Sequence, residues 1–187
     1  MHLKGNDCMI KMYKATRDDI DALMDMRLKM LREVNKLPEE HEFPEEFVNF
    51  TKLFFLHGNQ TTWIVDDGGA VGCASICYYE LMPTFDHPSG RRAQIMNVYT
   101  RPEYRKKGYA STLLRLLIED AKDRGVTEIK LDSAEGKGKL YKLAGFKDSE
   151  ECMVLDINRL LQRNIELAEK TGCKPHQCCS CEEKKES

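Results

Sequence analysis

Arg105-Lys106-Lys107-Gly108-Tyr109-Ala110 is a short basic loop with one glycine, and it connects a strand-like run to a helix-like run. A largely apolar run at residues 95–100 precedes it, and leucines and an alanine at helical spacing follow it over residues 113–121. A helix start offers backbone N–H groups without partners and partial positive charge, so it favours anions. Gly108 lets an anion approach the backbone because it has no Cβ. The segment therefore predicts a phosphate-binding loop, with a solvated basic loop before a core helix as the alternative.

A second informative segment, Leu140-Tyr141-Lys142-Leu143-Ala144-Gly145-Phe146, follows another strand-like run at residues 128–132. Together the two segments resemble the GNAT superfamily of N-acetyltransferases, which use acetyl-coenzyme A. The first family pattern, R/Q-x-x-G-x-G/A, is matched by Arg105, Gly108 and Ala110. The second, L-Y-x-x-x-G-F, is matched by Leu140, Tyr141, Gly145 and Phe146. The resemblance covers residues 9–157, which is most of the chain.

The resemblance implies an α/β fold of mixed α+β character, with a central mixed sheet of six to seven strands and helices on both faces. Apolar patterning predicts strands at residues 10–14, 61–66, 70–79, 95–100 and 128–132, and a last pair at residues 146–147 and 152–155. Helical spacing predicts helices around residues 20–34, 47–54, 113–121, 140–145 and 160–168. We expect an N-acetyltransferase domain at residues 9–157, followed by a helix and a Cys-rich polar tail at residues 158–187.

Composition narrows the class of protein further. The chain has 187 residues and a net charge of -2, which favours one main domain and gives no general attraction to nucleic acid. No apolar run approaches the ~20 residues that span a bilayer, and no signal-peptide core is recognisable, so we expect a cytoplasmic protein without membrane contact. A local basic patch in such a chain suits a small phosphorylated ligand.

The eight cysteines fall into two groups. Four lie in or beside predicted strands, where buried thiols are the favoured interpretation: Cys8, Cys73, Cys77 and Cys152. The other four crowd the C-terminus beside His176 and offer soft ligands for zinc: Cys173, Cys178, Cys179 and Cys181. Their spacing matches no established zinc pattern, so a metal site and an unliganded tail both stay open. No metal ligand is assigned to the active site.

The resemblance also implies how acetyl-CoA is held. Backbone N–H groups from Lys106 to Ser111 would cradle the pyrophosphate, and the backbone near Val98 would stabilise the carbonyl oxygen. Tyr99 and Thr100 would bind the pantetheine arm, although simple β-core packing also accounts for Val98 and Tyr99. The loop residues assigned to the cofactor are Arg105, Lys106, Lys107, Gly108, Tyr109, Ala110 and Ser111.

Two residues are candidates for proton transfer. Tyr141 would protonate the departing thiolate, since a phenol with a pKa near 10 can supply a proton to a thiolate whose acid has a pKa near 8.5. Packing of Tyr141 against the sheet is the structural alternative. The central strand offers Gln94 and Asn97 but no acid, so Glu80, at the end of the preceding strand, is the candidate base, acting through water.

These expectations define an acetyl-CoA-dependent N-acetyltransferase that acts on a primary amine by direct attack in a ternary complex. No cysteine or serine stands at a matched catalytic position, so no acyl-enzyme is expected. The alternative is a non-catalytic acyl-CoA-binding or sensor module whose Cys-rich tail binds a metal or a partner. Small polyamines, amino acids, drug-like amines and protein N-termini all stay open as acceptors, and a homodimer is also compatible with the sequence.

An acidic run lies between the first two predicted helices, at Glu39, Glu40, Glu42, Glu45 and Glu46. The resemblance implies that this connection borders the acceptor pocket. The negative charges of the run would then attract a cationic amine as acceptor. The structural alternative is stabilisation of a helix N-terminus by nearby carboxylates.

Overall fold

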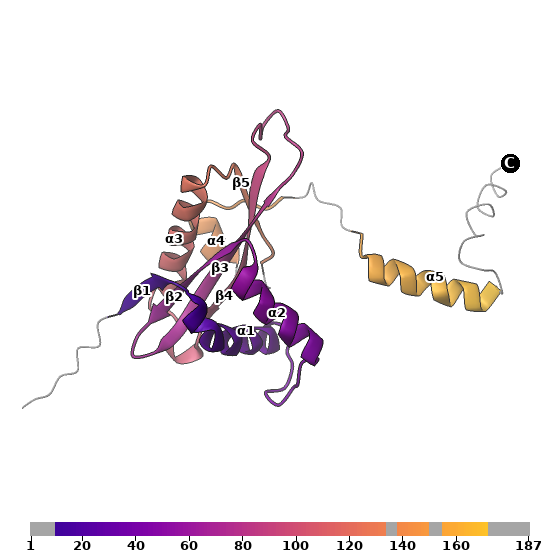
Figure 1. The fold of residues 1–187 in the computed structure, drawn as a ribbon, viewed down its shortest axis with the longest axis horizontal. Coiled ribbons are helices and arrows are strands. Elements are labelled where there is room, and N and C mark those ends of the chain that lie inside the picture. Colours follow the sequence, from indigo (N-terminus) through magenta and orange to yellow (C-terminus); the bar gives the residue numbers. More distant parts are fainter. Residues whose placement is uncertain (1–9, 134–137, 150–154, 172–187) are drawn as a thin grey trace, which may run out of the picture. The chain divides into compact units, whose positions relative to one another are not determined.

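The computed structural model describes residues 10–133, 138–149 and 155–171 (Figure 1). The chain divides into two units, Met1–Phe146 and Lys147–Ser187. The first unit contains the predicted cofactor loop and the predicted catalytic residues. The predicted domain limits at residues 157 and 158 stay a prediction.

The first unit is built on a five-stranded sheet in the order β1-β2-β3-β4-β5. The strands are β1 (Lys11–Lys14), β2 (Gln60–Asp66), β3 (Ala70–Glu80), β4 (Arg91–Thr100) and β5 (Glu128–Leu131). Strands β1 to β4 pair antiparallel in sequence order, whereas β4 and β5 are parallel and are joined through a helix. The sheet is therefore mixed, as predicted.

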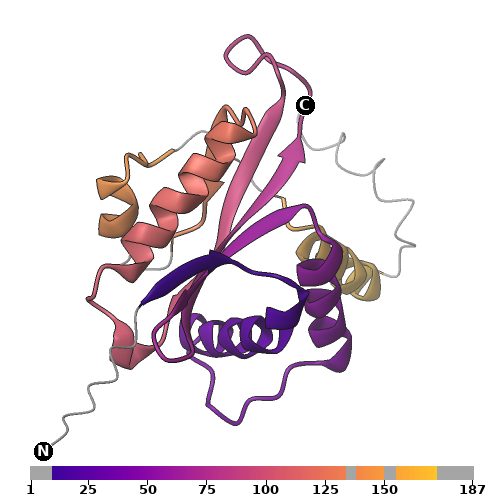
Figure 2. The same ribbon diagram turned by 60° about the vertical axis from the view of Figure 1, so that its left-hand side comes forward.

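Helices cover both faces of the sheet (Figure 2). Helices α1 (Ile20–Val34) and α2 (Glu45–His57) lie on one face, and α3 (Tyr109–Asp123) and α4 (Gly138–Leu143) lie on the other. On the α3 face, Leu113, Leu117 and Ala121 are buried against the sheet, at the helical spacing seen in the sequence. On the α1 face, Leu23 and Met26 pack with Ile64, Cys73 and Tyr99. This two-sided packing confirms the predicted fold class.

The sheet has fewer strands in the described residues than the six to seven predicted. Residues 146–147 do not form a strand, because the Phe146 N–H donates to the Tyr141 carbonyl oxygen (3.1 Å) and closes a turn after α4. Most of the predicted partner run, residues 152–154, lies outside the described residues. Phe146 instead packs its ring edge-on against Tyr141, with 6.2 Å between ring centroids.

The second unit contributes the helix α5 (Ile157–Thr171). Ile157, Leu161 and Ile165 recur at i, i+4 and i+8, so this helix is amphipathic. The four clustered cysteines of the tail and His176 lie outside the described residues, as do Cys8 and Cys152, so whether the tail binds a metal stays open. Among the helices that the structure describes, none has the length and apolar character needed to cross a membrane.

Asp120 of α3 joins the helix to β1 and β2. Its carboxylate accepts hydrogen bonds from Trp63 Nε1 (2.7 Å) and Lys14 Nζ (2.7 Å), and the Asp120 side chain is only 12% exposed. We expect Asp120→Ala to lower the free energy of unfolding by about 1–3 kcal/mol, because the indole N–H loses its acceptor. Urea unfolding followed by the fluorescence of Trp63 measures this. A loss no larger than that of the exposed control Asp123→Ala would contradict it.

Candidate active site

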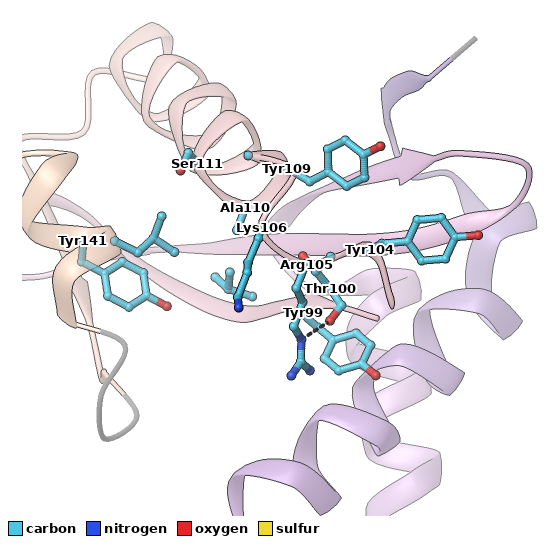
Figure 3. Close-up of a pocket in the computed structure, with 12 residues that line it drawn as sticks. Tyr99, Thr100, Tyr104, Arg105, Lys106, Tyr109, Ala110, Ser111 and Tyr141 are labelled. Atoms are coloured by element: carbon cyan, nitrogen blue, oxygen red, sulfur yellow. Dashed lines mark hydrogen bonds between the residues drawn. The ribbon is translucent and has the colours of Figure 1, made fainter. Parts of the chain in front are cut away.

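A cavity of about 290 Å³ lies where β4 ends, α3 begins and α4 approaches (Figure 3). Its walls combine the C-terminal part of β4, the basic loop, the first turn of α3 and one face of α4. The lining residues are Val98, Tyr99, Thr100, Tyr104, Arg105, Lys106, Gly108, Tyr109, Ala110, Ser111, Leu140 and Tyr141. The structure therefore gathers the predicted cofactor residues, except Lys107, around one space with Tyr141. Sequence reasoning missed Tyr104 and Leu140, although both adjoin residues that it selected.

The backbone of the loop is arranged to receive an anion. Lys106 (φ 62°) and Gly108 (φ 83°) adopt left-handed conformations, and Gly108 caps the start of α3. Among the described residues, no backbone or side-chain acceptor takes the N–H groups from Lys106 to Ser111. A Cβ placed on Gly108 would meet no atom within 4 Å, so the space beside it is open. These free donors at a helix start fit a diphosphate.

The three basic side chains of the loop have different surroundings. Arg105 donates from Nε to the Thr100 carbonyl oxygen (2.9 Å), pairs with Glu33 of α1 and lies over the Tyr99 ring. Its charge is therefore already engaged in holding the loop to β4 and α1. Lys107 lies 3.5 Å from Asp67 and over the Tyr104 ring, outside the cavity lining.

Lys106 differs from its neighbours, because its ammonium group makes no ion pair with any residue that the structure describes. It is exposed and belongs to the cavity lining. Of the three cations, Lys106 is therefore the one available to a bound phosphate.

The difference between the two lysines predicts unequal effects on coenzyme A binding. We expect Lys106→Ala to weaken coenzyme A by about 1 kcal/mol, close to fivefold in Kd, because an exposed charge pair is lost. Lys107→Ala removes the same charge from the loop but should change Kd less, since Asp67 already neutralises Lys107. Calorimetric titration at low salt compares them. Equal effects would show that only the net charge of the loop matters.

A bulge in β4 shapes the cavity wall. Cys73 lies opposite Tyr99 and Ser75 lies opposite Met96, so Asn97 and Val98 together face Ala74 of β3. Asn97 has φ 55°, a left-handed conformation that asparagine tolerates better than most residues. Pairing of β4 with β5 ends at Ile95 and Leu131, whereas β4 continues to Thr100.

Two buried polar atoms in this part of β4 have no hydrogen-bond partner among the described residues, Asn97 Oδ1 and Thr100 Oγ1. Thr100 lines the cavity, and Asn97 is 7% exposed. Buried polar atoms without partners are uncommon and costly in folded proteins, so each one calls for an explanation such as a bound water or ion or a functional role. The hydroxyl of Thr100 is thus a second polar group of the cavity wall without a partner among the described residues, beside the free N–H groups of the loop.

Tyr141 reaches the cavity from α4. Its side chain is 9% exposed, and in Figure 3 its ring extends from α4 toward the central strand. Burial raises the pKa of the phenol above its ordinary value, so Tyr141 stays protonated at neutral pH. Its hydroxyl has no hydrogen bond to another described residue and is therefore available to donate a proton.

The structure does not bring Glu80 to this cavity. Glu80 is the exposed last residue of β3 and lies opposite Arg91, seven positions before Val98 on β4. At about 3.3 Å per residue the two are ~23 Å apart. The predicted role of Glu80 as base therefore lacks geometric support.

A carboxylate that does lie near the end of the β4–β5 pairing is Asp132. It directly follows Leu131, the partner of Ile95, and accepts a hydrogen bond from Gln94 Nε2 (3.0 Å). Glu128, four residues earlier, pairs with the buried Arg92. Sequence reasoning missed Asp132 because only the pairing of β4 with β5 brings it beside the central strand.

Two of the five glutamates between α1 and α2 lie where carboxylates stabilise a helix N-terminus, which is the structural alternative for the acidic run. Glu45 and Glu46 form the first turn of α2, where carboxylates stabilise the helix dipole, and both are exposed. Glu39, Glu40 and Glu42 are exposed as well. Within the part of the chain that the structure describes, no cluster of three or more His, Cys, Asp or Glu residues could hold a metal ion.

A family model described as "Acetyltransferase (GNAT) family" matches residues 22–146, more than half of the chain. A solved structure of a predicted acetyltransferase with acetyl-CoA from Clostridium acetobutylicum is similar, with a TM-score of 0.71 and 26% identity. The match covers 81% of this chain and 98% of that one. The family resemblance inferred from the two sequence segments is thereby confirmed.

Similar proteins of known name point the same way. N-acetyltransferase 8 of Rattus norvegicus is 26% identical over 113 residues, which are 58% of this chain and 49% of the rat protein. Thialysine N-epsilon-acetyltransferase of Sus scrofa is 27% identical over 137 residues, 67% of this chain and 79% of the pig protein. The chain spans about half the length of the rat relatives that it matches.

Proposed function

Because the chain belongs to the acetyltransferase (GNAT) family, we propose that it transfers the acetyl group of acetyl-CoA to a primary amine by direct attack in a ternary complex. The observation that carries this proposal is the set of free N–H groups from Lys106 to Ser111, in a cavity that Tyr141 also lines. Neither a helix start nor a buried tyrosine is specific alone. In one cavity at the end of β4, the N–H groups can hold the diphosphate of the donor and Tyr141 can protonate the departing sulfur.

The fit of the cavity to acetyl-CoA rests on its donors. The loop N–H groups and Lys106 would hold the diphosphate, and the unpartnered Thr100 Oγ1 and the backbone of Val98 and Tyr99 would contact the pantetheine arm. Arg105 would position the loop through Thr100 and Glu33 and would not itself bind phosphate. This division of roles refines the expectation that all three basic side chains bind the ligand.

Acetyl-CoA supplies an activated thioester, whose carbon–sulfur bond breaks as the amine nitrogen bonds to the carbonyl carbon. The backbone at the β4 bulge would stabilise the carbonyl oxygen as it gains charge, and one well-placed N–H of this kind is worth about 3 kcal/mol of barrier. Tyr141 would give its proton to the departing sulfur and regain one from solvent. The raised pKa of Tyr141 keeps this proton in place at neutral pH.

The amine must lose a proton, and Asp132 is better situated than Glu80 to accept it through water. Asp132 adjoins the partner of Ile95, three residues or ~10 Å from Val98, whereas Glu80 is ~23 Å away. One or two water molecules bridge the shorter distance. Asp132→Asn should therefore depress the rate at neutral pH more than Glu80→Gln.

Release of free thiol from acetyl-CoA in the presence of an amine panel tests this function. The panel should include lysine and its analogues, since one relative is named for thialysine, together with polyamines and a peptide N-terminus. Turnover on any acceptor, with the acetyl group found on its nitrogen, supports the proposal. Coenzyme A binding without turnover on any acceptor would favour the non-catalytic acyl-CoA-binding module instead.

A further inference from the structure

We infer that Arg27 of α1 binds an oxyanion, a carboxylate or a phosphate, that the amine acceptor carries. The inference rests on the proposed acetyl transfer and adds the class of acceptor. Arg27 lies on the face of the sheet opposite α3 and the loop, the side from which an acceptor could approach the bulge without displacing acetyl-CoA. No residue of the cavity described above is part of this second site.

The position of Arg27 follows from the periodicity of α1. Leu23 and Met26 pack against the sheet, and Met30 is partly buried beside them, so Arg27 lies on the border of the packed face. Its side chain is partly buried, and the thiols of Cys73 and Cys77 on β3 lie close enough to influence its charge. Cys73 is fully buried, and burial raises its pKa to about 12, so this thiol carries no charge that could balance the guanidinium.

The guanidinium of Arg27 makes no hydrogen bond or ion pair with any residue in the described part of the chain. Its neighbours on α1 differ, since Asp25 pairs with both Lys29 and Arg101, and Glu33 pairs with Arg105. Partial burial of an unpaired guanidinium is costly, because the group is always charged and offers five N–H donors. The planar fork of arginine matches the two oxygens of a carboxylate or phosphate.

Cys73 links the part of α1 that carries Arg27 to the reacting part of β4. Cys73 packs with Met26, the residue before Arg27, and its thiol contacts Asn97, whose Nδ2 is 3.5 Å from Sγ. Asn97 Oδ1 is buried and has no partner among the described residues. The next residue, Val98, lines the cavity on the other side of the sheet. An acceptor held at Arg27 would thus lie near an unpartnered amide oxygen that can accept a hydrogen bond from its amine.

Two matched pairs of acceptors test the inference with the full chain. Lysine and cadaverine differ by a carboxylate, and phosphoethanolamine and ethanolamine differ by a phosphate. The wild type should show a higher kcat/KM for at least one anionic member, and the pair that responds identifies the anion. Arg27→Gln should lower that kcat/KM by about 10- to 100-fold, the value of a charge-assisted hydrogen-bonded pair. It should leave kcat/KM unchanged for the member of the pair that lacks the anionic group.

Arg115→Gln is the matched control, because Arg115 is exposed on α3 and the change removes the same charge. It should leave the preference intact, and Arg27→Lys, which keeps the charge but loses the fork, should fall between wild type and Arg27→Gln. If Arg27→Gln does not fold, the comparison of Arg27→Lys with the wild type decides. Preference for cadaverine and ethanolamine, or an unchanged preference in Arg27→Gln, would overturn the inference while acetyl transfer itself stands. Absence of turnover on every amine would instead overturn the proposed function.

Discussion

Replacing Tyr141 by phenylalanine should lower kcat by about 10²- to 10⁴-fold, the range that a positioned general acid contributes. The change removes one hydroxyl group and leaves the ring, so the packing against Phe146 should persist. No described residue holds that hydroxyl, so the change removes no hydrogen bond to the described part of the chain. The affinity for coenzyme A should therefore stay close to that of the wild type.

Steady-state kinetics at saturating acetyl-CoA, combined with calorimetric titration of coenzyme A, separates these two effects. Tyr13→Phe is the matched control, because it removes a phenol that donates to Asp19 (2.9 Å) at the start of α1, away from the cavity lining. Its kcat should not change. Unchanged turnover in Tyr141→Phe would remove Tyr141 as the proton donor and leave it a packing residue. A parallel loss of coenzyme A affinity would assign the hydroxyl to binding.

Replacing Gly108 by aspartate should weaken coenzyme A by about 10²- to 10³-fold. Two like charges about 4 Å apart repel by roughly 4 kcal/mol at an effective dielectric constant near 20, and solvent around the exposed loop reduces this value. The new side chain has open space around its Cβ, so it meets no steric clash, although the left-handed φ of 83° adds backbone strain. The added carboxylate would stand where the free N–H groups of Lys106 to Ser111 are expected to meet the diphosphate.

Gly108→Asn separates charge from conformation. Asparagine has nearly the shape of aspartate and tolerates the left-handed φ of 83°, but it is neutral. Coenzyme A titrations of both variants should therefore show a small loss for asparagine and a large loss for aspartate, with the difference shrinking as salt is raised. Equal losses in the two variants would mean that backbone strain, and not charge at a phosphate site, controls affinity.

The cofactor loop and the helix after it were predictable because their signals are local. A glycine at a helix start, free N–H groups and leucines at helical spacing all follow from consecutive residues, and the structure has α3 beginning at Tyr109 directly after Gly108. The short segment around Tyr141 predicts its role on its own, and the fold brings α4 against the same cavity as β4. Local patterns predict the loop, the helix α3 and Tyr141 one by one. The order of strands and helices typical of the family predicts that they lie close together.

The remaining features depend on contacts between distant residues. Arg105 and Lys107 resemble Lys106 in the sequence, but Glu33 and Asp67 engage their charges only in the folded chain. Glu80 looked close to the centre because it ends the preceding strand, yet antiparallel pairing carries it to the opposite end of β4 from Val98.

The bulge in β4 and the position of Asp132 also depend on how distant strands pair. Asn97 at a left-handed position is compatible with its residue type, but only the register with Cys73 and Ser75 reveals the bulge. Asp132 gains its place from the parallel pairing of β5 with β4. No pattern of neighbouring residues reports either register.

Calorimetric titration of coenzyme A into the full chain tests the central claim most directly, because every proposed role begins with the loop from Lys106 to Ser111 holding a diphosphate. We predict saturable uptake of one coenzyme A per chain, weakened by added salt. Absence of any heat of binding across the accessible concentration range, with the chain shown to be folded, would contradict the account.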